Sequence, residues 1–72
     1  MQRLGEKLRT LRQRHGLTLR QLGAELGMNY AYLSHIESGE RVPSVEVVIA
    51  IADYFGVSTD VLLYDDRELP RK

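Results

Sequence analysis

The stretch TLRQLGAELGMNYAYLSHIES, residues 18–38, decides how this chain folds. Thr18 followed three positions later by Gln21 matches a capping box, which predicts that a helix begins directly after Thr18. Gly27 ends that helix, and Asn29 is a favourable N-cap for a second helix that runs to the end of the stretch. Two short helices joined by a tight turn with glycine predict a helix-turn-helix, whose second helix enters the major groove in DNA-binding proteins.

Outward from this stretch, the same signals predict three more helices. One precedes Gly16, one lies between the cap Ser44 and Gly56, and a short one follows Ser58. No segment alternates with the period of a strand. The sequence therefore predicts an all-α, compact five-helix domain. Apolar residues at helical spacing give its expected core, which consists of Leu8, Leu11, Leu22, Leu26, Leu33, Ile36, Val48, Ile49, Ala52, Phe55 and Leu62.

Length and composition agree with one small globular domain. The chain has 72 residues, 43% hydrophobic and 28% charged, and no cysteine, which excludes disulfides and cysteine-based zinc sites. We expect the domain to occupy residues 1–64 and residues 65–72 to form a charged, frayed tail. The longest apolar run, residues 47–52, is far too short to span a membrane, and the N-terminus lacks the apolar core of a signal peptide.

The zero net charge hides an asymmetry. Residues 1–36 carry six basic and two acidic side chains, whereas residues 37–72 carry four basic and eight acidic ones. A chain polarised in this way can present a basic face to nucleic acid despite its neutral total. The alternative is that both halves are ordinary solvated helix faces.

An enzyme is not indicated. His15 and His35 are twenty residues apart on different predicted helices, without metal-ligand spacing. Ser34 and His35 are neighbours, so a helix turns them about 100° apart. We expect no cofactor and no metal.

Several further motifs carry a family resemblance over about residues 4–63. Together with the stretch quoted above, the chain resembles the lambda-repressor/Cro-like helix-turn-helix family, also called xenobiotic-response-element regulators. The matching motifs are Gly16-Leu17-Thr18, Leu26-Gly27, Ile36-Glu37-x-Gly39-x-Arg41-x-Pro43-Ser44 and Gly56-Val57-Ser58.

The resemblance implies which residues contact bases, and the usual phosphate donors are expected around them. Those at positions that contact bases in the family are Asn29, Tyr30, Ala31 and His35. Those expected at phosphates are Thr18, Arg20, Tyr32, Ser34, Ser38 and Arg41.

Some of these residues have another reading. Asn29 is also a helix cap, Tyr30 can pack across the helix pair, and His35 can be an ordinary surface residue. Arg41 can instead pair with Glu40 or Glu37.

Arg12 and Glu37 extend apolar rows of their helices, where an unpaired charge is costly. The resemblance implies that these two residues pair with each other, and we assign both to architecture.

The function expected is sequence-specific binding of double-stranded DNA by a transcriptional regulator of the repressor type. We expect a cytoplasmic protein of prokaryotic or phage type, associated with the nucleoid. We expect a homodimer on an inverted-repeat operator and no membrane partner. The dimer surface is expected on the last helix, at Val57, Val61, Leu62, Leu63 and Tyr64. The rival function is a protein–protein interaction module, of the antitoxin or co-regulator type, with DNA binding secondary.

Overall fold

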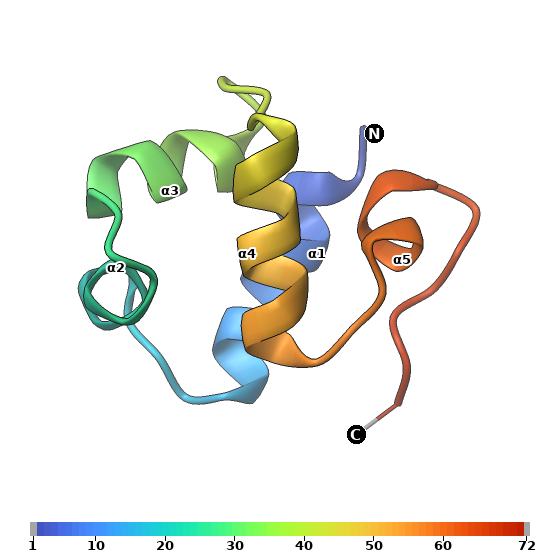
Figure 1. Ribbon diagram of the computed structural model, residues 1–72, viewed down its shortest axis with the longest axis horizontal. Coiled ribbons are helices and arrows are strands. Elements are labelled where there is room, and N and C mark those ends of the chain that lie inside the picture. The colour runs from blue at the N-terminus through green and yellow to red at the C-terminus, as the bar shows by residue number, and fades with distance from the viewer. Residues whose placement is uncertain (1, 72) are drawn as a thin grey trace.

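The computed structural model describes residues 2–71, and over this range the chain forms five α-helices and no strand. The all-α prediction is therefore confirmed. Figure 1 shows α4 in the middle of the molecule with α1 behind it, α2 and α3 on one side and α5 on the other. The helices are α1 (Leu4–Arg14), α2 (Leu19–Leu26), α3 (Tyr30–Ser38), α4 (Val45–Phe55) and α5 (Thr59–Leu63).

The helix starts follow from the predicted caps. The side chains of Thr18, Asn29, Ser44 and Ser58 each accept a hydrogen bond from a backbone N–H of the first turn of the helix that follows. The capping box of α2 is complete, because Gln21 Oε1 also accepts from the Thr18 N–H at 2.9 Å. The boundaries of these four helices are thus encoded locally.

The core contains most of the predicted residues, with two corrections. Leu26 is only partly buried, and Ile49 is 44% exposed. In α4 the buried side chains include Ile51 instead, which is fully covered. The sequence of α4 is apolar on nearly every side, so its periodicity could not decide which flank faces inward. The complete buried set is Leu4, Leu8, Leu11, Leu22, Leu33, Ile36, Val48, Ile51, Ala52, Phe55 and Leu62.

The main chains of α1 and α3 touch at Gly5. A Cβ atom at this position would collide with the carbonyl oxygen of Ile36 and lie 2.6 Å from that of Glu37. Both α1 and α2 pack against α3. The C-terminal turn of α3 is therefore seated directly on the backbone of α1.

The segment after α5 returns to the start of α1. The carboxylate of Asp65 accepts hydrogen bonds from the N–H groups of Gln2 (3.1 Å) and Arg3 (3.0 Å). Arg3 also donates to Glu68, at 2.8 and 3.0 Å. The side chain of Arg3, the N-cap residue of α1, does not cap the helix. Asp65 instead provides the acceptor for the N–H groups of Gln2 and Arg3. That the tail frays remains a prediction, and Lys72 lies outside the described residues.

Lys7 is buried, although a lysine in the first turns of a helix is expected to be exposed. Its side chain is 1% exposed, and its ammonium donates to the carbonyl oxygens of Val61, Tyr64 and Arg67 at 2.7, 2.8 and 2.6 Å. These carbonyls belong to α5 and the turn after it. The last carbonyl groups of a helix have no N–H donor within the helix, so they need a donor from elsewhere. Lys7 therefore fastens α5 to α1.

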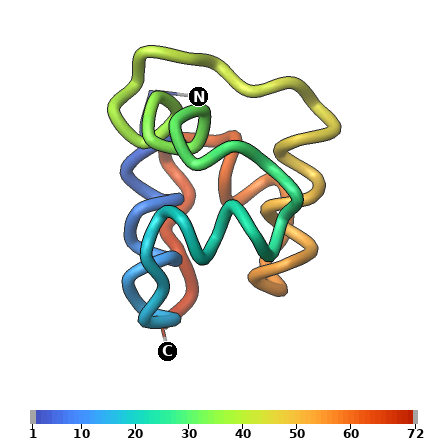
Figure 2. Tube along the Cα trace, turned by 90° about the vertical axis from the view of Figure 1, so that its left-hand side faces the viewer, coloured from blue at the N-terminus to red at the C-terminus, as the bar shows by residue number. Residues whose placement is uncertain are grey.

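The remaining side of the molecule is formed by α2 and α3. In Figure 2 these two helices lie toward the viewer, with α1 to one side of them and α4 to the other. The outer surfaces of α2 and α3 are covered by no other element of the described chain.

Candidate nucleic-acid interface

The turn between α2 and α3 is tight because two glycines allow it. Gly27 has a φ of 67°, a left-handed conformation that favours glycine. The N–H of Met28 donates to the carbonyl oxygen of Gly23 at 2.8 Å. A Cβ atom on Gly23 would lie only 2.6 Å from the Met28 carbonyl oxygen. The turn therefore folds directly onto α2, which fixes how α3 leaves it.

One side of α3 anchors the helix and the other is free. Leu33 and Ile36 are 0% and 1% exposed and lie in the core. Ala31 and His35 are exposed on the opposite side, as the sequence predicts. The expected contact residues of α3 share this outer side, where Ser38 is also exposed and Ser34 is half-buried.

Asn29 caps α3 and keeps part of its amide free. Its Oδ1 accepts from the Ala31 N–H at 2.7 Å. Within residues 2–71 its amide nitrogen has no hydrogen-bond acceptor, and the oxygen retains a second lone pair. Capping and base contact are therefore compatible in this side chain.

Arg20 of α2 and Tyr30 of α3 contact each other. The guanidinium carbon of Arg20 lies 4.1 Å from the centroid of the Tyr30 ring, and Arg20 Nη2 donates to the Tyr30 hydroxyl at 3.1 Å. Both residues are exposed. The alternative in which Tyr30 packs across the helix pair is thus realised, through an arginine rather than an apolar residue.

Arg41 is arranged differently. Its guanidinium carbon lies 5.4 Å from the centroid of the half-buried Tyr32 ring. Neither of the acids suggested as partners pairs with it within the described chain, because Glu37 binds arginines of α1 and Glu40 lies beside His35. Arg41 is left as an exposed cation at the end of α3.

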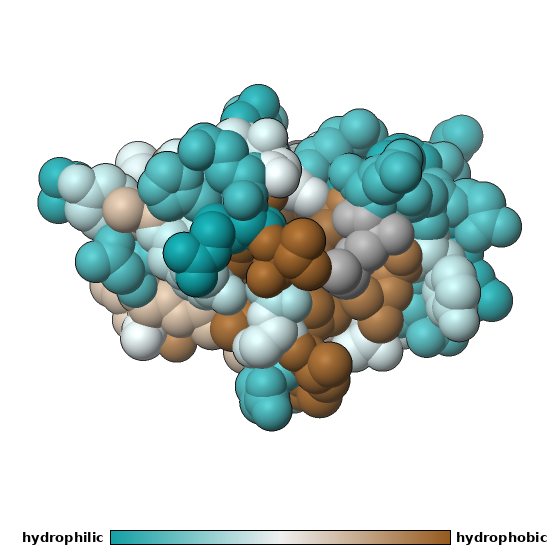
Figure 3. All heavy atoms as spheres, turned by 90° about the horizontal axis from the view of Figure 1, so that it is seen from above, coloured by the Kyte–Doolittle hydropathy of each residue, from teal (hydrophilic) through white to brown (hydrophobic). Residues whose placement is uncertain are grey.

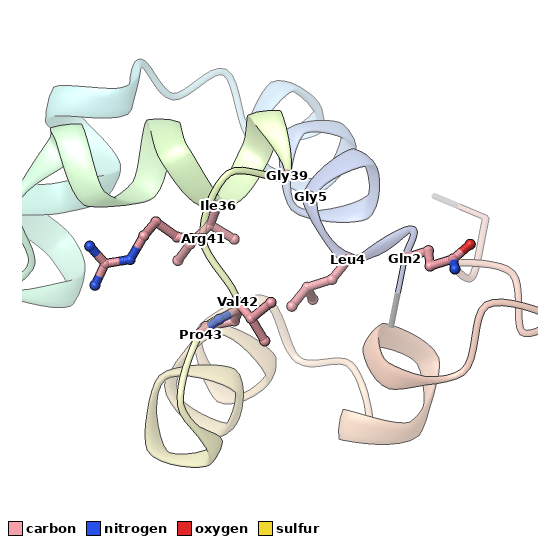
Figure 4. Close-up of a pocket in the computed structure, with 8 residues that line it drawn as sticks. All are labelled: Gln2, Leu4, Gly5, Ile36, Gly39, Arg41, Val42 and Pro43. Atoms are coloured by element: carbon pink, nitrogen blue, oxygen red, sulfur yellow. The ribbon is translucent and has the colours of Figure 1, made fainter.

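A pocket beside Arg41 is apolar in character. It has a volume of about 410 Å³. Figure 4 shows the side chains of Leu4 and Val42 pointing toward each other across it, while the Arg41 side chain leads away from it. The pocket lacks a charge aimed into it, so it does not resemble an anion site. Its lining residues are Gln2, Leu4, Gly5, Ile36, Gly39, Arg41, Val42 and Pro43.

Glu40, at the C-terminal end of α3, pairs with residues of that helix rather than with Arg41. The carboxylate Oε1 of Glu40 is 2.9 Å from Ser38 Oγ and 3.3 Å from His35 Nδ1. Hydrogen bonding from Ser38, and then from His35, lowers the pKa of Glu40 below its usual range. Helix α3 itself has no exposed acid, but Glu40 in the loop after it lies next to Ser38 and His35. Glu40 directly follows Gly39, the glycine that ends α3. This position in the sequence indicates that its carboxylate can turn back toward the last turn of the helix.

Arg12 and Glu37, which the resemblance pairs, lie together between α1 and α3. Arg12 Nε donates to Glu37 Oε2 at 2.7 Å, and Arg12 Nη2 donates to Oε1 at 3.1 Å. Arg9 adds a bond to Glu37 at 3.3 Å, and Arg12 also donates to the Leu17 carbonyl at 2.8 Å. The hydrogen bonds that Arg12 donates to Glu37 raise the pKa of Arg12. The Glu37 side chain is 2% exposed, so this carboxylate depends on its arginines.

Most of the basic N-terminal half is used by the structure. Lys7 is buried, and Arg3, Arg9 and Arg12 pair with acids. The expected basic face therefore shrinks. Two arginines remain beside α3, Arg20 in α2 and Arg41 after α3. Neither pairs with an acid of residues 2–71.

Other kinds of site find no support. Within residues 2–71 no group of three or more His, Asp or Glu side chains is placed to hold a metal ion. No helix in that range has the length and apolar content to cross a membrane.

Comparison with known proteins places these features in a family. A family model described as "Helix-turn-helix domain" matches residues 3–63. The chain is 39% identical, over 89% of its length, to a propionyl-CoA carboxylase regulator of Cereibacter sphaeroides, of which it covers 14%. It is 36% identical, over 86% of its length, to an uncharacterized HTH-type transcriptional regulator of Methanocaldococcus jannaschii, of which it covers 96%. It is also 35% identical, over 89% of its length, to the HTH-type transcriptional repressor RghR of Bacillus subtilis, of which it covers 48%. The chain thus spans less than half of two of these relatives and nearly all of the third.

Proposed function

The chain belongs to the helix-turn-helix family of DNA-binding transcriptional regulators, and we propose that it acts by placing α3 in the major groove of double-stranded DNA. One observation supports the placement of α3 in the groove. The outer side of α3 is polar and uncovered, while its inner side is held by Leu33 and Ile36. Arg20 and Arg41 flank that outer side with charges that no acid of the described chain neutralises.

The proposed base-reading residues follow from the chemistry of the groove. Asn29 offers an amide that can bind adenine, and the Ala31 methyl suits the methyl group of thymine. His35 and Tyr30 add hydrogen-bonding groups further along and at the tip of α3. No carboxylate on the outer side of α3 itself opposes the approach of a phosphate.

The proposed phosphate contacts surround this reading surface. Backbone N–H groups at the start of α2 and arginine side chains are the usual donors to phosphate oxygens. Here the proposed arginine donors are Arg20 and Arg41, and the proposed hydroxyl donors are Thr18, Tyr32, Ser34 and Ser38. Because the uncompensated charges at the surface are few, we expect a shallow salt dependence, with a slope of log affinity against log salt of about −2 for each protomer.

We propose that two copies bind an inverted-repeat operator, since one such domain contacts one half-site and half-sites lie about 34 Å apart. The surface proposed for pairing, called here the α4 surface, consists of Val42, Val45, Ile49 and Leu63. Val42 and Val45 are 73% and 71% exposed. A hollow of about 200 Å³ lies between α4 and α5 beside them. Figure 3 shows apolar side chains gathered in the middle of the face that holds the α3–α4 loop, with hydrophilic residues around them.

This surface revises the one expected from the sequence. Leu62 is 0% exposed and belongs to the core of the protomer, so it is not available to a partner. Leu63 remains in the proposed surface, and α4 supplies most of the rest. Repression follows if the dimer occludes a promoter, and the site of action is then the cytoplasmic DNA.

The test is binding to a library of randomised operators at fixed salt, for the wild type and three variants. Asn29→Ser keeps the cap but removes the amide, and His35→Ala removes the ring. Each is expected to alter preference at one base-pair position, by about 1–3 kcal/mol for a bidentate contact. Arg41→Ala is expected to weaken binding to all sequences alike and to reduce the salt slope by about one unit.

Two outcomes contradict the proposal. If the wild type selects no motif and binds a protein partner independently of salt, the chain is an interaction module rather than a DNA reader. If Arg41→Ala reshapes the selected motif while Asn29→Ser and His35→Ala leave it unchanged, the assignment of readers and phosphate contacts is wrong.

A further inference from the structure

The contact between Arg20 and Tyr30 joins the two helices of the motif through their exposed side chains. The guanidinium lies over the ring at 4.1 Å from its centroid, and the Arg20 Nη2–Tyr30 hydroxyl bond is 3.1 Å long. Tyr30 is 41% exposed and is not among the residues that pack against the core. Arg20 is the side chain that stacks on its ring and hydrogen-bonds to its hydroxyl.

The backbone of Tyr30 also lies close to α2. A Cβ atom on Gly23 would lie 3.4 Å from the Tyr30 nitrogen and 3.5 Å from its Cα. The main chain of Tyr30 therefore passes close to the main chain of α2. Tyr30 therefore lies next to α2 both through its main chain at Gly23 and through its side chain at Arg20.

Arg20 has donors to spare while it holds the ring. A guanidinium carries five N–H groups, and one of them is used by the Tyr30 hydroxyl. The others are free to bind a phosphate oxygen without releasing the ring. Holding the ring in one position before DNA arrives also removes a cost of ordering it at the interface.

We propose that Arg20 is a positioning residue for Tyr30, so that a side chain of α2 that touches no base helps to set the base preference read from α3. This inference rests on the proposed function and deepens it. It assigns to Arg20 a contribution to specificity in addition to its phosphate contact.

Arg41 offers a matched comparison within the same surface. It too is an exposed arginine close to a tyrosine of α3, but its guanidinium carbon is 5.4 Å from the Tyr32 centroid. It donates no hydrogen bond to the Tyr32 hydroxyl. Tyr32 is half-buried and therefore needs no arginine to hold it.

The experiment is a double-variant cycle read by selection from randomised operators at fixed salt. The proteins are the wild type, Arg20→Ala, Tyr30→Ala, the double variant and Arg41→Ala, with the melting temperature of each recorded to confirm folding. Arg20→Ala is expected to reduce preference by about threefold to fivefold at the same base-pair position that Tyr30→Ala alters. In the Tyr30→Ala background, Arg20→Ala is expected to weaken binding to all sequences alike. Arg41→Ala is expected to leave the preference unchanged.

The failures are distinguishable. If the wild type selects a motif but Arg20→Ala leaves every base preference unchanged, Arg20 is a phosphate contact only and the inference is overturned. The same holds if Arg20→Ala changes preference equally with and without the Tyr30 ring, since the effect then does not pass through Tyr30. If the wild type selects no motif at all, it is the proposed function that fails, and the inference falls with it.

Discussion

The buried ammonium of Lys7 donates a 2.7 Å hydrogen bond to the main-chain carbonyl of Val61, a residue 54 positions further along the chain. The same ammonium also donates to the carbonyls of Tyr64 and Arg67, so one side chain binds three carbonyls at and after the end of α5. A helix of five residues offers little burial of its own, so this contact matters for where α5 lies.

Replacing this lysine should therefore destabilise the domain. Lys7→Met keeps the apolar length of the side chain but leaves three carbonyls without their donor, and we expect a loss of about 1–3 kcal/mol in the free energy of unfolding. Urea unfolding followed by circular dichroism measures this loss. The control is Gln13→Met on the exposed side of α1, which should change stability by less than about 0.5 kcal/mol. Equal stability of the two variants would show that the carbonyls find other partners.

The carboxylate of Glu37 should be costly to remove alone. Glu37→Leu leaves Arg12, whose side chain is 14% exposed, facing an apolar residue, and we expect a loss of about 3–5 kcal/mol. The double variant Arg12→Met/Glu37→Leu should recover much of that loss, because no unpaired buried charge then remains between α1 and α3. Chemical unfolding of the wild type, the single variant and the double variant tests this. A double variant less stable than Glu37→Leu would contradict it.

Acid should loosen the return of the tail. The N–H of Arg3, and then that of Gln2, lowers the pKa of Asp65, and the Arg3 guanidinium lowers the pKa of Glu68. A carboxylate with a lowered pKa in the folded state stabilises that state above its unfolded-state pKa, and this contribution disappears as pH falls through the folded-state pKa. Stability should thus decline as pH drops from about 5 toward about 2.

The variant Asp65→Asn isolates this effect. It should be less stable than the wild type at neutral pH and should show a smaller decline in melting temperature on acidification. Asp53→Asn, on the exposed part of α4, serves as the control and should keep the wild-type pH profile. A parallel decline for Asp65→Asn and the wild type would mean that the acid sensitivity arises elsewhere.

The α4 surface should control assembly. Val45→Lys places a charge on a residue that is 71% exposed, so the protomer should remain folded while pairing on an inverted-repeat duplex is lost. Sedimentation with and without that duplex measures the stoichiometry. Tyr64→Lys, on the 55% exposed residue after α5, is the comparison. If Tyr64→Lys rather than Val45→Lys prevents pairing, the dimer surface lies at the end of α5 instead.

The sequence predicted local features best. Four caps and the Gly27 turn were read correctly, because a side chain and its neighbours within four positions decide each of them. The inward side of α4 was misjudged at Ile49, where apolar residues on both flanks made the two rotations of the helix equivalent.

Contacts between distant residues were harder to predict. Lys7 lies between Leu4 and Leu11 on the buried row of α1, but a lysine there would be read as an exposed charge unless the carbonyls of α5 were known to be near. The Arg20–Tyr30 contact likewise depends on how α2 and α3 are oriented. The base and phosphate contacts themselves remain predictions.

The close approach at Gly5 has a consequence for redesign. The main chain of α1 at Gly5 and the core residues Leu33 and Ile36 hold α3 from its inner side. The exposed residues Ala31 and His35 can therefore be replaced while the position of α3 is kept. New side chains grafted there should yield altered operator preferences at nearly constant melting temperature, which makes this small domain a convenient platform for reprogramming.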